Sequence, residues 1–488
     1  MSGDRRIDID GISVSCLHFI DGQRVDSALT FDNHSPLDWS MSLGDIARGD
    51  EKTADQALTA ARRAFPAWAA LSATERAATM TRLAELIDAN IDKIAHIECL
   101  DMAMLEESLR LRVIPRAALN FKSYADLARD YEERVWDSKG TDNRVIRMPS
   151  GVSVIITPWN APFMLSTWKC APALAAGNTV ILKPAEWSPL SASLLADLIN
   201  EAGFPPGVFN IVQGLGSEVG SALVSDPRVS RISFTGSTRA ARVIGKLAAE
   251  NIVPFTAELG GKGPLLVFED ADIDAAAKKA AGQYDDSGQV CMAGTRLLVQ
   301  ESVANEFLEK FNHYTDQHIM GDSRAAETTI SPLIHPRHME NVDGFVERAR
   351  DNGDEIVRGG QVRPEGGLWY EPTLIKPRSN DSEIVQEEVF GPVLCFQTFA
   401  DESDGIALAN STKYGLAAMV YTGDADRAER VGRAVRAGTV WVNTFLIRDL
   451  TAPFGGVGNS GIGREGGDYA LDFHSDLKTL QILQGSVS

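Results

Sequence analysis

One of the five cysteines has the surroundings of a nucleophile. Cys291 lies between Gly288 and Gly294, and glycines allow the backbone to come close to a bound molecule. A free thiol has a pKa of about 8.5, so this role requires a local influence that increases the thiolate fraction. The alternative is a small buried apolar side chain, which is the more common role of a lone cysteine.

Two further side chains follow short β-prone runs, where α/β sheets present their ligands. Glu258 has the carboxylate of a general base, although it could instead cap the next helix or pair with Lys262. Asn160 stands between Pro158 and Pro162, and a stiffly held amide is suited to donate to an oxyanion. A turn of this composition can also use asparagine only to satisfy its own backbone.

Two glycine-rich turns and a nearby charged pair indicate a nucleotide site. Residues 214–220 read Gly-x-Gly-x-x-x-Gly, one residue longer than the dinucleotide fingerprint, and residues 234–238 also lead from a strand into a helix. Backbone N–H groups at such helix N-termini bind phosphate. Lys183 and Glu186 follow the second predicted strand and would offer a cation and a carboxylate to a ribose, with the carboxylate disfavouring a 2′-phosphate.

Seven motif regions, in order and over nearly the whole chain, resemble those of the NAD(P)-dependent aldehyde dehydrogenases. They are Pro158-Trp-Asn160, Leu182-Lys-Pro-Ala-Glu186, Phe234-Thr-Gly-Ser237, Glu258-Leu-Gly-Gly-Lys262, Gly288-Gln-Val-Cys291, Glu387-Glu-Val-Phe-Gly-Pro392, and Pro453-Phe-Gly-Gly456 with Ser460-Gly-Ile-Gly-Arg464. The resemblance implies Cys291 as nucleophile, Glu258 as general base and Asn160 as oxyanion donor. It also implies oxidation of an aldehyde to a carboxylate through a cysteine thiohemiacetal and thioester, by a homodimer or homotetramer.

The resemblance further implies NAD as cofactor. Lys183 and Glu186 are expected at the adenosine ribose, and Glu388 and Phe390 at the nicotinamide end. The other expected cofactor contacts are Ile156, Thr157, Trp159, Ala185, Gly216, Phe234, Gly236, Ser237 and Leu259. Because Glu186 should accept hydrogen bonds from the ribose hydroxyls and repel a phosphate, we expect NAD to be preferred over NADP.

Within this family the sequence is similar to the 2-hydroxymuconic semialdehyde dehydrogenase branch, which oxidises acidic semialdehydes from aromatic-ring breakdown. That branch carries an Ile-Pro-Arg segment, present as Ile114-Pro-Arg116, and an Arg-Asp-Leu-Arg-Thr-Pro-Phe segment, present as Arg448-Asp-Leu-Thr-Ala-Pro-Phe454. Thr451 replaces the second arginine of the latter segment. Because arginine is the favoured clamp for a carboxylate, Arg116 and Arg448 would hold one acid group.

Two interpretations of the substrate follow. The side chains expected to line its tunnel are Arg116, Phe163, Trp168, Phe445 and Arg448. If the arginines bind substrate, the enzyme prefers a semialdehyde with one carboxylate. If Asp449 neutralises Arg448, or the arginines form structural salt bridges, the aromatic side chains admit neutral aromatic or aliphatic aldehydes instead.

Two other functions are less favoured. A CoA-acylating dehydrogenase would use a thiol in place of water, and Glu258 in its motif favours water. A non-catalytic binding protein of the same fold would be expected to have lost Cys291 or Glu258, and the chain keeps both.

A βαβ pattern positions these residues. Between Gly151 and Gly261 helix-like segments alternate with four β-branched runs, at 152–156, 179–182, 208–212 and 229–234. One helix is marked by Ser188 as N-cap, Pro189 at the first helical position and Gly203 beyond its end. Strands separated by such helices form a parallel, doubly wound sheet.

The flanking segments extend this α/β pattern. Residues 54–131 have apolar positions at helical spacing and should pack against the sheet. After residue 261 a second alternation predicts strands at 296–300, 416–421 and 439–442 and helices at 303–313 and 339–352. Two β-prone segments, 144–148 and 479–483, stand apart, and such outliers often pair with another subunit.

The predicted fold is therefore α/β, with two doubly wound open-sheet domains and a small β arm. The expected parts are a Rossmann-like NAD-binding domain of residues 1–125 and 149–257, a catalytic domain of residues 258–469, and an oligomerisation arm of residues 126–148 and 470–488.

The composition argues against nucleic acid or a membrane as partner. Lys and Arg number 47 against 67 Asp and Glu, and the net charge of −20 repels phosphate backbones and anionic lipid. The sequence contains neither a long apolar span nor a Cys-x-x-Cys pair, so we expect a cytoplasmic protein without an export signal. The histidines lack metal-ligand spacing, so no metal is expected.

Overall fold

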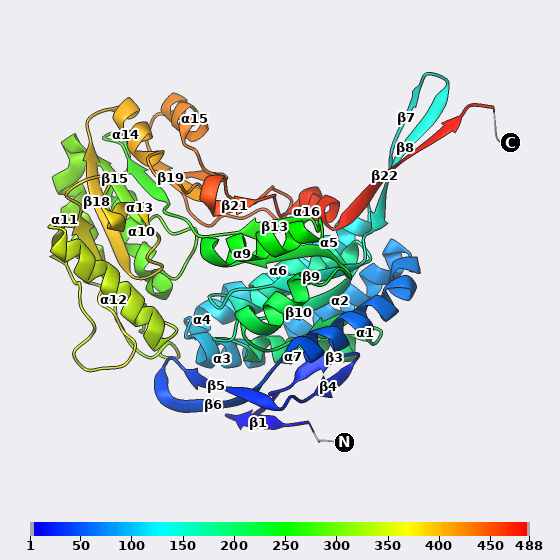
Figure 1. The fold of residues 1–488 in the computed structure, drawn as a ribbon. Helices are drawn as coiled ribbons and strands as arrows, with labels where there is room; N and C mark the ends of the chain where they lie inside the picture. Colours follow the sequence, from blue (N-terminus) through cyan, green and yellow to red (C-terminus); the bar gives the residue numbers. More distant parts are fainter. Residues whose placement is uncertain (1–3, 486–488) are drawn as a thin grey trace.

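Two helix-covered sheets make up most of the molecule, and a third, smaller sheet projects from them (Figure 1). The structure is a computed structural model that describes residues 4–485. The ends of the predicted NAD-binding domain and arm, residues 1–3 and 486–488, lie outside the described residues. No helix within residues 4–485 is long and apolar enough to cross a membrane.

The first sheet has eight strands, and its middle five are parallel. In spatial order they are β21 (Gly461–Ile462), β13 (Phe255–Glu258), β12 (Val229–Thr235), β9 (Val152–Ile156), β10 (Thr179–Lys183), β11 (Phe209–Ile211), β3 (His18–Ile20) and β4 (Gln23–Val25). All residues of β9 and β10 are buried, as expected for parallel strands covered on both faces. The predicted parallel sheet is confirmed, and its strand order reverses direction beside β9, where such sheets bind ligands.

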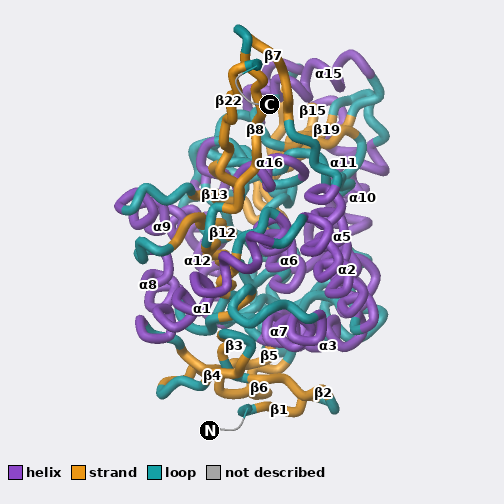
Figure 2. Tube along the Cα trace, turned by 90° about the vertical axis from the view of Figure 1, so that its right-hand side faces the viewer, coloured by secondary structure: helices purple, strands orange, loops and turns teal. Residues whose placement is uncertain are grey.

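Helices cover both faces of this sheet (Figure 2). One face carries α1 (Glu51–Ala70), α8 (Ser221–Val224) and α9 (Thr238–Glu250), and the other carries α6 (Pro162–Ala175) and α7 (Leu190–Ala202). An outer layer on α6 and α7 consists of α2 (Ala73–Ala89), α3 (Ile91–Met102) and α5 (Ile114–Arg129). The expectation that residues 54–131 pack on the sheet is therefore correct for α1 but wrong for the outer layer, because α6 and α7 already occupy that face.

Helix α7 begins one residue later than predicted. Pro189, and not Ser188, occupies the N-cap, and no side chain of its own caps the helix. The Ser188 hydroxyl donates to the backbone oxygen of Trp159 at 3.2 Å. The first free N–H of the helix, on Leu190, donates to Asp101 Oδ2 of α3 at 2.8 Å. A distant carboxylate thus takes the capping role that local sequence assigned to Ser188.

The second sheet has seven strands and confirms the second α/β unit. In spatial order they are β16 (Glu355–Arg358), β17 (Thr373–Lys376), β18 (Val393–Phe399), β15 (Arg296–Gln300), β14 (Pro264–Val267), β19 (Ala417–Tyr421) and β20 (Thr439–Val442), with only β16 antiparallel to its neighbour. The helices of this part are α10 (Ile273–Ala281), α11 (Ala304–Thr315), α12 (Pro336–Asp351), α13 (Glu383–Gln386), α14 (Glu402–Ala409) and α15 (Ala425–Ala434).

Helix α12 starts earlier than the predicted residue 339 because its cap is a histidine. His335 is the N-cap residue, and its Nδ1 accepts a hydrogen bond from Arg337 N at 3.0 Å. Pro336 follows at the first helical position, where its missing N–H costs nothing.

The projecting sheet joins the two detached β-prone segments. Strand β22 (Ser475–Leu483) pairs antiparallel with β8 (Thr141–Pro149), which also pairs with β7 (Arg134–Ser138). Figure 1 shows this arm leaving the body of the molecule beside α16 (Gly467–Phe473). The two segments were expected to pair with another subunit, whereas here they pair with each other.

The remaining elements are short. Near the N-terminus β1 (Arg6–Ile9) pairs with β2 (Ile12–Ser15), and β5 (Leu29–Ser35) pairs with β6 (Asp38–Arg48). Between α3 and α5 lie α4 (Glu106–Ser108) and a π-helical turn, Leu109–Val113. All five cysteines are free.

Candidate active site

The loop before Cys291 has an unusual backbone. Asp286, Ser287 and Gly288 are three consecutive residues with left-handed φ values of 52°, 53° and 66°. A Cβ on Gly288 would lie 2.2 Å from the carbonyl oxygen of Gly391, so only glycine fits there. The tight turn leads to Cys291, which is half-buried.

The thiol of Cys291 is held in its neutral form in the free enzyme. Burial, together with the charges of Glu388 and Glu258, raises its pKa to about 12 against the opposing effect of Arg448. Glu258 and Arg448 therefore both lie close enough to influence the thiol. A nucleophilic role requires this pKa to fall when cofactor and substrate enter.

Asn160 is joined to the nucleophile loop. It follows β9, immediately before α6, and its Nδ2 donates to the backbone oxygen of Gln289 at 2.9 Å. The side chain of Gln289 in turn accepts from Ile334 N at 3.0 Å. The structure thus brings the predicted oxyanion donor within two residues of Cys291 along the partner loop.

Glu258 ends β13 and is 5% exposed. Neither carboxylate oxygen has a hydrogen-bond partner in the described residues. Burial raises its pKa well above the usual value, and the charge of Glu465 adds to that effect, while Lys169 opposes it. A carboxylate with a raised pKa and free oxygens is suited to take a proton from water.

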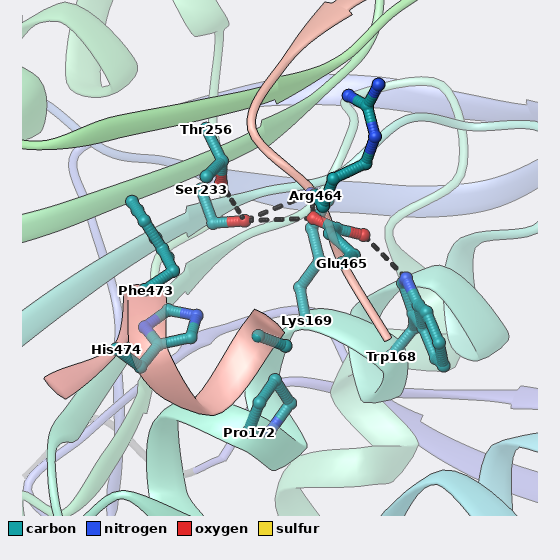
Figure 3. A pocket seen from close by; sticks show the side chains of 10 residues that line it. Trp168, Lys169, Pro172, Ser233, Thr256, Arg464, Glu465, Phe473 and His474 are labelled. Carbon is teal, nitrogen blue, oxygen red and sulfur yellow. Dashed lines mark hydrogen bonds and ion pairs between the residues drawn. The ribbon is translucent and has the colours of Figure 1, made fainter. Parts of the chain in front are cut away.

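The two charges that act on Glu258 form a buried ion pair, Lys169 with Glu465 (Figure 3). The Lys169 ammonium of α6 contacts Glu465, with the two side chains 0% and 9% exposed. Glu465 also accepts from the indole N–H of Trp168, and the Lys169 ammonium donates to Ser233 Oγ at 3.0 Å. No motif in the sequence predicts this pair. The only signals were a lone lysine on an apolar helix and an acid directly after the seventh motif.

Arg116 and Arg448 converge on one ring. Their guanidinium carbons lie 5.2 and 5.6 Å from the centroid of Trp168. Arg448 also stacks on Phe454 at 3.8 Å. Burial and the charge of Arg448 together lower the pKa of Arg116 to about 10.

Neither arginine forms an ion pair with a carboxylate among residues 4–485, although the charges of Glu258 and Glu465 act on Arg448. Arg116 Nε donates to Asn120 Oδ1 at 3.1 Å, and Arg448 lies 3.6 Å from the sulfur of Met292, next to Cys291. The Asp449 carboxylate instead accepts from the backbone and hydroxyl of Thr451. The proposed neutralisation of Arg448 by Asp449 is therefore wrong.

The aromatic residues expected in the tunnel lie in two places. Phe445 is half-buried, makes an edge contact with Trp441 at 5.4 Å and packs in the same cluster as Cys291. Phe163 is 0% exposed and packs, with Trp168, in the core between α5 and α6.

Several of the predicted cofactor contacts lie at one edge of the first sheet. The Lys183 ammonium and Glu186 carboxylate lie 3.0 Å apart after β10. Beside β12, a Cβ on Gly236 would lie 2.6 Å from the Phe234 ring, and Ser237 caps α9. A Cβ on Gly216, by contrast, would have no other atom within 4 Å. Open space at a glycine turn, a helix N-terminus and a paired cation and carboxylate fit a dinucleotide.

The other predicted contacts surround this edge. Ile156 and Thr157 end β9, Ala185 lies between Lys183 and Glu186, and Leu259 follows β13. Glu388 Oε1 accepts from Gly261 N at 2.9 Å, shortly after Leu259, and burial raises the pKa of Glu388 to about 7.

Trp159 bridges the two halves of the molecule. Its ring makes edge contacts with Phe390 at 5.2 Å and with His338 at 5.3 Å. His338 Nε2 lies 2.8 Å from the carbonyl oxygen of Phe390, which has a left-handed φ of 59°. No motif in the sequence predicts these contacts of His338, because its partners lie far away along the chain.

With this geometry in place, the known relatives of the chain identify its class. Residues 24–480 match the aldehyde dehydrogenase family. The chain therefore belongs to this family, and it is an aldehyde dehydrogenase enzyme.

Individual relatives cover nearly the whole chain. It is 38% identical to 2-hydroxymuconic semialdehyde dehydrogenase of Pseudomonas sp. (strain CF600), covering 95% of this chain and 98% of that one. It is 38% identical to human 2-aminomuconic semialdehyde dehydrogenase, covering 95% and 97%. Among solved structures, a mutant P. syringae indole-3-acetaldehyde dehydrogenase in complex with NAD+ and IAA has a TM-score of 0.94 at 37% identity, covering 97% of each chain.

Proposed function

We propose that this enzyme uses NAD to oxidise an aldehyde that carries one carboxylate. The observation that supports this most directly is the pair Arg116 and Arg448, two cations on one indole ring without an ion-paired carboxylate among residues 4–485. Like charges brought together out of water need a compensating anion, and a carboxylate held by arginine meets that need. The semialdehyde dehydrogenases among the relatives support the same class.

The proposed chemistry begins at Cys291. Its thiolate adds to the aldehyde carbon, and Asn160 donates to the oxygen that becomes negative. Loss of one such donor typically costs about 2.7 to 4 kcal/mol of transition-state stabilisation. When bound, NAD supplies the hydride acceptor that the oxidation requires.

The acyl group then remains on Cys291 as a thioester. Glu258 takes a proton from a water molecule, and the resulting hydroxide adds to the thioester carbon. The carbon–sulfur bond breaks, the product leaves as a carboxylate, and the thiolate is regenerated. The raised pKa of Glu258 matches this role, because a more basic carboxylate removes the proton more readily.

NAD would lie across the edge described above. Lys183 and Glu186 would contact the adenosine ribose, and the turns at Gly216 and Ser237 would hold the phosphates. Glu388 and Phe390 would contact the nicotinamide end. The domain division, 1–125 with 149–257 and then 258–469, is part of this proposal.

A second candidate substrate is a neutral aldehyde. The half-buried Phe445 beside Cys291 and the stacking of Arg448 on Phe454 favour it, because aromatic rings can hold a guanidinium without a substrate anion. Thr451 also removes the arginine that the resemblance led us to expect.

A matched pair of aldehydes tests the choice. We expect succinic semialdehyde to exceed butanal in kcat/KM with NAD+, followed by NADH absorbance. Arg116→Ala and Arg448→Ala should each lower the rate with the acid by about 10- to 150-fold and spare butanal. Arg110→Ala removes an exposed arginine paired with Asp92 and serves as control. Preference for butanal that neither arginine variant alters would exclude the acid substrate.

The arm is proposed to join subunits into a dimer or tetramer. Its strands expose large apolar side chains, including Trp136 at 37% and Leu477 at 57%. Such side chains on a projecting sheet are typical of subunit contacts. Sedimentation equilibrium of the wild type and of Leu477→Asp tests this, and a wild-type monomer would refute it.

A further inference from the structure

Helix α3 directs two buried carboxylates at the two helices that follow the candidate site loops. Glu98 Oε2 accepts from Phe163 N of α6 at 3.0 Å, and Asp101 Oδ2 accepts from Leu190 N of α7 at 2.8 Å. The two acids are three residues apart, so they lie on one face of α3. Both side chains are 0% exposed.

These carboxylates replace the caps that the helices lack. Neither Ala161 nor Pro189, the N-cap residues of α6 and α7, makes a side-chain capping bond. A carboxylate at a helix N-terminus satisfies a free N–H and interacts favourably with the helix dipole. Here the carboxylate comes from another helix, so the cap also fixes the position of each helix start relative to α3.

Each cap lies next to a different part of the active site. Helix α6 begins at Pro162, directly after the turn that carries Asn160, whereas α7 begins at Leu190, after the turn that carries Lys183 and Glu186. The turns have a link of their own, from Ser188 Oγ to the backbone oxygen of Trp159 at 3.2 Å.

The two acids are not part of ion pairs within residues 4–485. Asp101 Oδ1 accepts from Asn33 Nδ2 at 2.6 Å. Glu98 Oε1 makes no well-aligned hydrogen bond, although the Ser191 hydroxyl of α7 lies near enough to oppose the rise in the pKa of Glu98. Burial raises the pKa of Glu98 to about 8 and that of Asp101 to about 7. Because a protonated carboxyl keeps its carbonyl oxygen, each cap can persist in either protonation state.

We propose that Glu98 and Asp101 are positioning residues that act on separate parts of the active site. Glu98 holds the turn of the oxyanion donor Asn160, and Asp101 holds the turn of the ribose pair Lys183 and Glu186. This inference rests on the proposed roles of those turns. It predicts that loss of the Glu98 cap slows hydride transfer, and that loss of the Asp101 cap weakens NAD binding.

Single-turnover kinetics and cofactor binding separate the two effects. At saturating NAD+, Glu98→Leu and Glu98→Asp should lower the rate constant of NADH formation about tenfold or more, because small displacements of a catalytic group cost that much. The Kd of NAD+, from calorimetry, should change by less than about threefold. Glu98→Gln keeps the acceptor oxygen and should restore the rate. The substrate is the better of succinic semialdehyde and butanal.

Asp101 should give the opposite pattern. Asp101→Leu is expected to raise the Kd of NAD+ about tenfold and to leave the single-turnover rate at saturating NAD+ within about threefold. Asp101→Asn keeps one acceptor for Leu190 N and should fall between wild type and Asp101→Leu.

A matched control tests for general loss of stability. Asp354 is also a buried acid, 5% exposed, that accepts from Arg378 N and Ser382 Oγ at 2.7 and 2.8 Å in the other half of the molecule. Asp354→Asn should lower only the Tm. The inference is wrong if the Glu98 and Asp101 variants, like this control, lower only the Tm. It is also wrong if each variant changes the single-turnover rate and the Kd of NAD+ equally.

Two features keep the test decisive. If Glu98→Leu does not fold, Glu98→Asp decides, because it moves the acceptor by about 1.5 Å and retains the acid. A wild type that forms no NADH from any aldehyde refutes the proposed function, whereas a working wild type with inseparable variants refutes only this inference.

Discussion

Asn160 and Gln289 are joined by a hydrogen bond of 2.9 Å between the side-chain amide of the first and the backbone oxygen of the second. The bond holds the candidate oxyanion donor against the loop that carries Cys291 two residues later. Donor and nucleophile come from different sheets, so this contact sets their relative position before substrate arrives.

Replacing the thiol should remove the reaction and spare the cofactor site. We expect Cys291→Ala to form no NADH while the Kd of NAD+ stays within about twofold, because only the thiol bonds the substrate. Stopped-flow absorbance and calorimetry measure the two quantities. Sustained turnover by the variant would exclude Cys291 as nucleophile.

Glu258→Gln should separate the two halves of the reaction. A burst of NADH close to one equivalent per active site is expected, followed by a steady rate lowered about 10²- to 10⁴-fold, because hydride leaves before water attacks. Rapid-quench kinetics would show the burst. If the burst and the steady rate disappear together, Glu258 is needed to activate Cys291 instead.

The cofactor preference should depend on Glu186. We expect kcat/KM to favour NAD over NADP by at least about tenfold, since the carboxylate would lie beside the 2′-phosphate. Glu186→Ala should narrow this ratio, because it frees Lys183, now paired at 3.0 Å, to bind the phosphate. A wild type that favours NADP would contradict the ribose role.

The charges around Cys291 should set its reactivity. In the free enzyme the raised thiol pKa, about 12, means that alkylation by iodoacetamide accelerates as the pH rises from 7 to 10. Removing the carboxylate that raises this pKa, with Glu388→Gln, should speed alkylation at a fixed pH, and Arg448→Ala should slow it. If both variants are alkylated at the wild-type rate, neither charge acts on the thiol.

The acids of α3 should make stability fall as the pH rises. Glu98 has a pKa of about 8 in the folded chain, against about 4.3 when unfolded. Between these values the folded state binds the extra proton, so its free energy of unfolding decreases with pH and levels off above pH 8. Differential scanning calorimetry should show a smaller decrease in Glu98→Gln than in wild type. If stability depends on pH equally in wild type and in Glu98→Gln, the pKa of Glu98 does not differ between the folded and unfolded states.

Strands and helix ends could be predicted where they depend on residues that are neighbours in the sequence. Val152–Ile156 and Val229–Thr235 form strands as their β-branched residues predicted, and Gly203 ends α7 with a left-handed φ of 86°. The start of α7 was missed because its cap, Asp101, lies 89 residues earlier in the chain. Capping rules read neighbouring residues only, so they assigned the role to Ser188.

The sequence suggested candidate residues for the site, but not the contacts that these residues make with one another. Motifs singled out Cys291, Glu258 and Asn160 as candidates, yet the contact between Asn160 and Gln289 spans 129 residues. The convergence of Arg116 and Arg448 on Trp168 likewise depends on the packing of α5, α6 and the loop before Phe454. Residue types could suggest these roles, but only the tertiary fold brings the groups together.

The ion pair between Lys169 and Glu465 has a consequence for how the enzyme is made. Its partners are 296 residues apart, and β21, which completes the first sheet, also comes from the last 30 residues of the chain. During synthesis the strands from β9 to β13 emerge long before Glu465 does, and contacts of such separation form late. The nascent chain would therefore carry Cys291 and Glu258 without a finished pocket around them until Glu465 has been synthesised, and termination before that point would yield an inactive product.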